Sequence, residues 1–187
     1  MTFEINALAT MNLLEWAKNK NCKVVYAGSS SIHNGKYENP YSFSKDVAEQ
    51  ICYMYKELFD VNMSICRFYN VYGDYQLTDG EYAAVVGIFL EQFKKGEPLT
   101  ITGDGLQRRD FTHVDDIVEG MILISETDWE LVELGSGKNY SINELAEMLY
   151  DLSKSLSEMT KIPCGFSECC PPATPDMFLQ TLCLVGL

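Results

Sequence analysis

Long hydrophobic runs and basic residues are both scarce in this 187-residue chain. No apolar segment approaches the roughly 20 residues of a membrane-spanning helix, and the opening residues, MTFEIN, lack the basic and apolar regions of a secretion signal. Lys and Arg number 14 against 27 Asp and Glu, for a net charge of −13, so bulk charge does not favour a nucleic-acid-binding surface. We therefore expect a cytoplasmic protein without a membrane or nucleic-acid partner.

The spacing of a zinc site is also missing. The cysteines of residues 164–170 form C-x4-C-C, but no second cysteine pair or histidine stands where a zinc ligand would be needed. No metal is expected. Cys22, Cys52 and Cys66 each lie alone in an apolar pattern, which is typical of reduced cysteines packed in a core.

The composition is that of a globular domain, with 47% hydrophobic and 22% charged residues. Helical and extended patterns alternate along the chain. Helices are expected at residues 4–19, 41–59, 82–95 and 115–126, and extended segments at 23–27, 63–69, 99–102, 109–112 and 131–134. A capping box, Ser141-x-x-Glu144, opens a last helix. This alternation predicts an α/β fold with a parallel sheet and crossover helices.

The first helix is expected to be amphipathic. Six apolar residues recur at helical spacing and mark its apolar side: Ile5, Leu8, Ala9, Leu13, Trp16 and Ala17.

Tyr41 and Lys45 stand four residues apart in the second helix, so both side chains project from one face. An ammonium beside a phenol stabilises the phenolate, the form that accepts a proton. The preceding strand ends in Ser29-Ser30-Ser31, and ligands of open parallel sheets bind at the carboxyl ends of the strands. A proton-transfer site is one interpretation, and an exposed helix pair beside capping serines is the other.

Seven ordered motifs extend this pattern along the chain. They are N-x3-T-x-NLLE from residue 6, YAGSSS from 26, NPYSFSK from 39, RFYNVYG from 67, GEPLTITGDG from 96, RDFTHVDD from 109, and LGSG followed by SINEL from 134. With them the chain resembles the extended short-chain dehydrogenase/reductase family, specifically the NAD-dependent nucleotide-sugar epimerases that are similar to UDP-glucose 4-epimerase. The resemblance implies part of a Rossmann-like domain and part of a small α/β substrate domain.

The resemblance also implies roles for residues around the second helix. Tyr41 matches the residue that exchanges the proton of the sugar hydroxyl, and Lys45 matches its phenolate-stabilising neighbour, which also binds the cofactor ribose. Ser31 matches the hydroxyl that bonds the reacting sugar oxygen. Ser29 and Tyr69 fall on the cofactor side, Tyr69 near the nicotinamide. The expected catalytic residues are thus Tyr41, Lys45 and Ser31, and the expected cofactor-binding residues are Tyr41, Lys45, Tyr69 and Ser29.

Two further residues match positions that hold the substrate. Asn70 and Arg109 correspond to residues that bind the diphosphate of a nucleotide sugar, while Ser31 binds its sugar. A guanidinium suits this role because an acidic protein needs placed cations to hold a diphosphate. Arg108, beside it, is expected to be a surface charge.

One departure of the sequence from the family pattern concerns the binding of the cofactor. The glycine-rich fingerprint G-x-x-G-x-x-G, which receives the cofactor pyrophosphate, is expected before Asn6 and does not occur in the 187 residues, so an N-terminally truncated member is expected. Residues 32–34, after Ser31, include none of the carboxylates of nucleotide-sugar dehydratases and decarboxylases, which favours an epimerase acting at C4 of a UDP-sugar. His33 is either a loop histidine or a base. A dehydratase or reductase and a non-catalytic remnant of the fold are the alternatives.

We expect three parts along the chain. Residues 1–75 form a partial NAD-binding Rossmann-like domain without the glycine-rich loop, residues 76–160 a partial substrate-binding domain, and residues 161–187 an irregular tail. Family members pair through the helices expected here at 4–19 and 41–59, so a homodimer is expected. Its contacts are expected to include Met11, Leu14, Phe43 and Met54.

Overall fold

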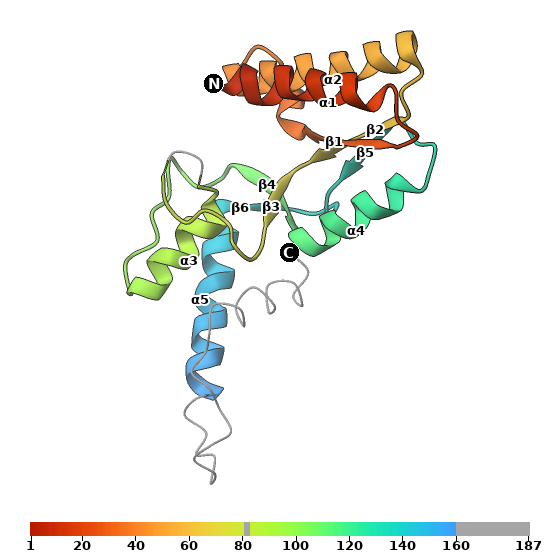
Figure 1. The fold of residues 1–187 in the computed structure, drawn as a ribbon. Helices are drawn as coiled ribbons and strands as arrows, with labels where there is room; N and C mark the ends of the chain where they lie inside the picture. The colour runs from red at the N-terminus through yellow and green to blue at the C-terminus, as the bar shows by residue number, and fades with distance from the viewer. Residues whose placement is uncertain (81–82, 160–187) are drawn as a thin grey trace. The chain divides into compact units, whose positions relative to one another are not determined.

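A computed structural model describes residues 1–80 and 83–159, with side chains as far as residue 152. The expected irregular tail and the C-x4-C-C motif lie outside the described residues. The chain forms two compact units, which Figure 1 shows as a ribbon. Among the described residues, unit 1 comprises Met1–Tyr69 and Asp115–Gly135, and unit 2 comprises 70–80, 83–114 and 136–159. None of the helices in the described ranges is both long and apolar enough to cross a membrane.

The units are therefore not two consecutive stretches. Residues 115–135, which a boundary at residue 75 assigns to the second part, belong to unit 1, because β5 (Leu131–Leu134) pairs with β2 (Met63–Phe68). The division into a cofactor-binding part before residue 75 and a substrate-binding part after it stays a prediction.

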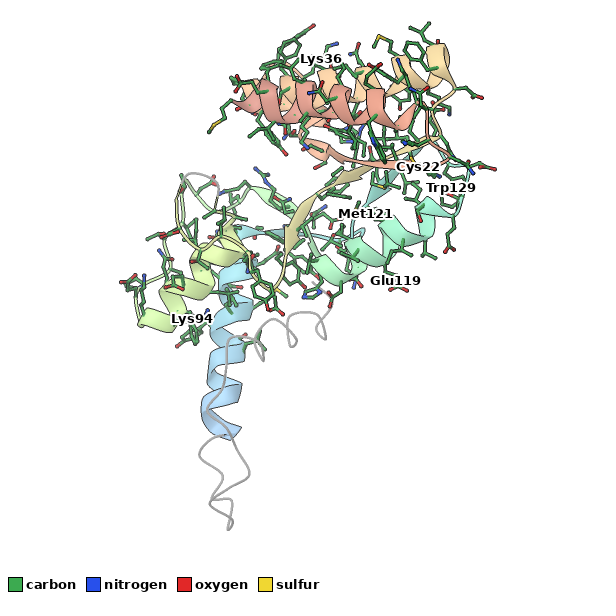
Figure 2. The ribbon with its side chains drawn as sticks, viewed as in Figure 1. Cys22, Lys36, Lys94, Glu119, Met121 and Trp129 are labelled. Carbon is green, nitrogen blue, oxygen red and sulfur yellow. The ribbon has the colours of Figure 1, made fainter. Side chains whose placement is uncertain are left out.

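Unit 1 is built on a parallel sheet in the order β1-β2-β5, with β1 at Val24–Ser29. The three expected strands and their parallel pairing are thus confirmed. Two helices, α1 (Ala9–Ala17) and α2 (Pro40–Phe59), lie side by side on one face of this sheet, and α4 (Val114–Ser125) lies on the other (Figure 1). Figure 2 shows Met121 on the sheet side of α4 and Glu119 on its opposite side. The carboxyl ends of all three strands lie together on one side of the sheet, where ligands of such sheets bind.

The core of unit 1 corrects the predicted face of the first helix. A π-helical segment, η1 (Glu4–Leu8), leads into α1, and the two bury Ala7, Thr10, Leu14 and Ala17. Of the expected apolar side only Ala17 is buried, whereas Ile5, Leu8, Ala9, Leu13 and Trp16 are exposed. Both sides of this helix are apolar, and the side with the smaller residues packs on α2, because small side chains allow two helices to approach closely.

Cysteines lie in the interior of unit 1, and Cys52 belongs to the same core cluster as Leu14 and Ala17. Cys52 and Cys66 are buried and Cys22 is half-buried, and all three are free thiols. Burial raises the pKa of Cys52 to about 12. The prediction of reduced core cysteines is confirmed for Cys52 and Cys66.

Unit 2 contains a small mixed sheet. Its order is β3 (Asn70–Tyr72), β4 (Arg108–His113), β6 (Asn139–Ser141), with β3 parallel and β6 antiparallel to β4. The antiparallel strand β6 follows a tight glycine turn and returns beside β4. Residues 99–102, expected to be extended, form no strand.

Two helices pack against this sheet, α3 (Val85–Lys95) and α5 (Ile142–Met159). The core between them contains Tyr72, Phe89, Phe111, Leu145 and Leu149. The predicted capping box opens α5: the Ser141 hydroxyl accepts from the Glu144 amide at 3.0 Å, and the Glu144 carboxylate accepts from the Ser141 amide at 2.7 Å.

Candidate functional site

The first turn of α2 holds Tyr41 in a fixed place. Asn39 caps the helix by accepting from the Ser42 amide at 2.9 Å, and Pro40 occupies the first helical position. The Ser44 hydroxyl donates to the Tyr41 carbonyl at 2.7 Å and itself accepts from the Asn6 side chain at 2.9 Å. The Tyr41 side chain is 45% exposed, so its phenol can be reached by a ligand.

Lys45, one turn further along α2, reaches across to β1. Its ammonium donates to the Ala27 carbonyl at 2.9 Å and lies 5.2 Å from the centre of the Tyr26 ring, a cation–π contact. Burial lowers the pKa of Lys45, with Glu49 acting in the opposite direction. These two contacts fix the ammonium near the carboxyl end of β1.

The serines that follow Ala27 form a compact turn. Ser29 closes β1, and its hydroxyl lies 2.9 Å from that of Ser31 and accepts from the Ser31 amide at 3.2 Å. Ser31 belongs to a short 3-10 turn, η2 (Ser30–Asn34). Unit 1 therefore brings Ser29 and Ser31 to the end of the strand to which Lys45 is bonded.

Tyr69 comes directly after β2, and its hydroxyl donates to the Glu133 carboxylate at 2.8 Å. The same carboxylate lies 2.7 Å from the His33 imidazole. His33 is exposed, as expected of a loop histidine, but it is paired. The sequence reasoning missed Glu133, because nothing local connects it to residues 64 and 100 positions away. The placement of Tyr69 beside a nicotinamide stays a prediction.

A buried ion pair supports this end of the sheet from within the core. Arg67 donates to Glu49 of α2 through Nε at 3.1 and 3.2 Å and through a terminal nitrogen at 2.7 Å. A Cβ at Gly28 would stand 2.7 Å from a Glu49 oxygen and 3.1 Å from Arg67 Cγ, so only glycine leaves room for this pair. No local sequence pattern connects Glu49 with Arg67, which stands 18 residues further along the chain.

Unit 2 brings together the two residues predicted to hold a diphosphate. Asn70 and Arg109 line one cavity of about 340 Å³, whose wall is completed by residues of α3, of the 100–107 loop and of the start of α5. The Asn70 amide donates to the Asp110 carbonyl at 3.1 Å, and the Arg109 guanidinium donates to the Arg108 carbonyl at 2.8 Å. Both bonds end on backbone carbonyls of β4 and limit the movement of the two side chains.

Arg108, expected to be a surface charge, is exposed but has a structural role. It donates to the Asn139 side chain and carbonyl and lies 3.0 Å from Glu144 of the capping box. Neighbouring arginines in one strand thus have different tasks: one supports the helix cap, and the other lines the cavity.

Known proteins resemble this chain over most of its length. A family model described as "NAD dependent epimerase/dehydratase family" matches residues 1–140. The UDP-glucuronate 4-epimerase of Thermodesulfobacterium geofontis is 35% identical over 159 residues, which cover 77% of this chain and 48% of that protein. The UDP-N-acetyl-alpha-D-glucosaminuronate decarboxylase of Bacillus cytotoxicus is 30% identical over 207 residues, covering 96% of this chain and 63% of that protein.

A solved structure gives the same relationship in three dimensions. The UDP-glucuronic acid 4-epimerase from Bacillus cereus, in complex with UDP-glucuronic acid and NAD, matches with a TM-score of 0.71 at 30% identity, over 80% of this chain and 51% of that one. The chain spans about half the length of most curated relatives it matches, 52% and 48% for the first two.

Proposed function

This chain belongs to the NAD dependent epimerase/dehydratase family, and we propose from that premise that it contributes the catalytic tyrosine and the substrate-holding residues of an enzyme that inverts C4 of a UDP-hexose. The observation that carries the proposal is the start of α2. There Tyr41 is reachable, and the Lys45 ammonium is fixed 2.9 Å from the Ala27 carbonyl, at the strand end that the two serines follow.

Tyr41 is proposed to take the proton from the sugar 4-hydroxyl and to return it after the sugar has turned over. Lys45 stabilises the phenolate that does this, because an opposite charge nearby favours the ionised form. Ser31 donates to or accepts from the same sugar oxygen, and its contact with Ser29 at 2.9 Å holds the hydroxyl in place. A general acid–base group of this kind contributes about 10²- to 10⁴-fold to a rate.

The donor groups of unit 1 fit the nicotinamide–ribose half of NAD. An ammonium has three N–H groups, so Lys45 can hold Ala27 and still donate to a ribose hydroxyl. Tyr41 and Lys45 would hold that half, with Ser29 and Tyr69 beside it. NAD, when bound, supplies the acceptor and donor of hydride that inversion at a carbon requires.

The cavity of unit 2 is proposed to receive the diphosphate of the substrate. Arg109 offers a planar guanidinium, the group best matched to phosphate oxygens, and Asn70 adds an amide donor. In a protein of net charge −13, such a placed cation is what attracts a dianion that the rest of the surface repels.

A decarboxylase acting on a UDP-uronate is the second candidate, because a decarboxylase aligns with 96% of this chain. The two reactions share the proton transfer at O4 and differ in the step after it. Residues 32–34 provide no carboxylate next to Ser31, and the His33 ring is engaged by Glu133 at 2.7 Å. These features favour inversion at C4 over decarboxylation.

A homodimer is proposed through the exposed sides of α1 and α2. Leu14 does not contribute, since it is fully buried in the core of unit 1, which corrects the expected contact set. Met54 is exposed, and Phe43 and Met54 line a surface groove on α2 together with Val47 and Ile51.

The reaction is tested by incubating the complete gene product with NAD and UDP-glucose or UDP-glucuronate and following the sugar protons by NMR. Appearance of the C4 epimer supports the proposal. Release of CO₂ from the uronate identifies the decarboxylase, and unchanged substrates would indicate a non-catalytic member.

The diphosphate role has its own test. Arg109→Ala is expected to weaken UDP binding in calorimetry by about 1.5–3 kcal/mol, the range of hydrogen bonds to charged groups. Lys94→Ala is the matched control, because Lys94 is an exposed cation in the last turn of α3 (Figure 2) and does not line the cavity. Equal affinities of the two variants would remove Arg109 from this role.

A further inference from the structure

Four side chains meet at the carboxyl edge of the unit 1 sheet, and Glu133 is common to their contacts. One carboxylate oxygen accepts from the Tyr69 hydroxyl at 2.8 Å, and the other lies 2.7 Å from His33 Nε2 and 3.5 Å from a terminal nitrogen of Arg67. Arg67 and Glu133 are register partners on the adjacent strands β2 and β5. The two oxygens of this carboxylate therefore contact side chains from two segments, the turn η2 and the end of β2.

The Arg67 end of this cluster is rigid. Its guanidinium is also held by the buried carboxylate of Glu49, at 2.7 Å. Two carboxylates share this one guanidinium, so Arg67 connects Glu133 to the buried Glu49 of α2. An ion pair fixed from inside the core in this way limits the movement of Glu133 more than an isolated surface pair does.

The segments that Glu133 joins are those with predicted site residues. His33 stands two positions after Ser31 in the short turn η2, and Tyr69 is the predicted cofactor-side aromatic residue after β2. The bond from His33 to Glu133 ties η2 to β5, the strand at the opposite edge of the sheet from β1. One carboxylate thus holds both the serine turn and the tyrosine hydroxyl.

We propose that Glu133 is a positioning residue for the site: through His33 and Tyr69 it fixes the turn containing Ser31 and the ring of Tyr69. The significance for catalysis rests on the proposed function, since Ser31 and Tyr69 matter only if sugar and cofactor bind there. The positioning itself is a property of unit 1 and is measurable without turnover.

Amide hydrogen exchange tests the positioning directly. Glu133→Gln keeps the size of the side chain but removes the charge that holds His33 and Arg67. Glu130→Gln is the matched control, because Glu130 lies three residues earlier and makes a solvent-exposed pair with Lys56 at 3.3 Å. We expect residues 30–34 to exchange about 10-fold faster in Glu133→Gln, as loss of hydrogen bonds to a charged group implies, and to be unchanged in the control.

Turnover by the complete gene product gives the second readout. Displacement of the turn should lower the rate of reaction more than it weakens binding of the substrate. We therefore expect kcat of Glu133→Gln to fall about 10- to 100-fold and KM to change less than about threefold. Tyr69→Phe, which removes one of the three bonds, should show a smaller part of the same loss. The proposal would be overturned if residues 30–34 of Glu133→Gln exchanged at the wild-type rate, or if exchange rose equally throughout unit 1. An unchanged kcat would overturn it as well. An inactive wild type would instead overturn the proposed function and leave the exchange test valid.

Discussion

The Glu49–Arg67 pair gives the sharpest stability prediction, because it is buried and bidentate. Glu49 is 3% and Arg67 17% exposed, and three N–O contacts of 2.7–3.2 Å join them. Glu49→Gln keeps the shape but leaves the guanidinium without its main counter-charge. Breaking a buried pair from one side costs about 3–5 kcal/mol. In this variant Arg67 still has Glu133 at 3.5 Å. We therefore expect the free energy of unfolding to fall by an amount at the lower end of this range, about 3 kcal/mol.

Urea unfolding followed by tryptophan fluorescence measures this loss. The chain has two tryptophans, Trp16 and Trp129, and both belong to unit 1, so the signal reports the unit that contains the pair. Glu130→Gln, which breaks the exposed pair with Lys56, should cost less than about 1 kcal/mol. A loss in Glu49→Gln no larger than in this control would refute the assignment of a supporting role to the buried pair.

Three other outcomes are expected. Gly28→Ala should destabilise unit 1 by about 1–3 kcal/mol, the cost of overpacking, since the new Cβ would meet Glu49 at 2.7 Å; an unchanged urea midpoint would contradict this. Burial acts to raise the pKa of Glu133, but bonds from Tyr69, His33 and Arg67 outweigh it and hold that pKa below its ordinary value. A carboxyl group with a lowered folded pKa stabilises the fold above its unfolded pKa and loses this effect as the pH falls through the folded value. Wild type should therefore lose more stability below about pH 4 than Glu133→Gln does, and parallel losses would contradict the shift. Alkylation at about pH 8, near the usual pKa of a free thiol, followed by peptide mass spectrometry, should label Cys22 well before Cys52, whose thiol is buried with a pKa of about 12; equal rates would contradict that burial.

Local signals in the sequence predict most of unit 1. Asn39 and Pro40 mark the start of α2, and the three β-rich runs become the three parallel strands. The Ser141–Glu144 capping box of unit 2 is confirmed atom by atom. In each case the determining interaction lies within a few residues, so the sequence pattern contains it.

Features that depend on distant contacts are not predictable in this way. The side of α1 that is buried depends on what α2 offers, and its apolar periodicity fits either side. The strands β3 and β6 have three residues each, too few to show a period of two. The meeting of Glu133 with His33 and Tyr69 has no local signature, because it requires β5 to pair with β2, more than 60 residues away in the chain.

For the candidate site, the sequence predicts the element on which each residue lies but not its contacts. The spacing in α2 predicts that Lys45 faces the same side as Tyr41, and the structure adds its bond to Ala27 and its contact with the Tyr26 ring. Asn70 and Arg109 are predicted to share a ligand, and they line one cavity. Their roles toward NAD and a nucleotide sugar remain predictions.

Turnover by Tyr41→Phe tests the central claim most directly, because the variant loses only the phenolic hydroxyl. In the complete gene product, with the C4 epimer followed by proton NMR, we predict that kcat falls about 10²- to 10⁴-fold, as for loss of a general acid–base group. UDP affinity should stay unchanged, since the cavity with Arg109 lies in unit 2. A Tyr41→Phe variant whose kcat stays within about threefold of an active wild type would contradict the assignment of proton transfer to Tyr41.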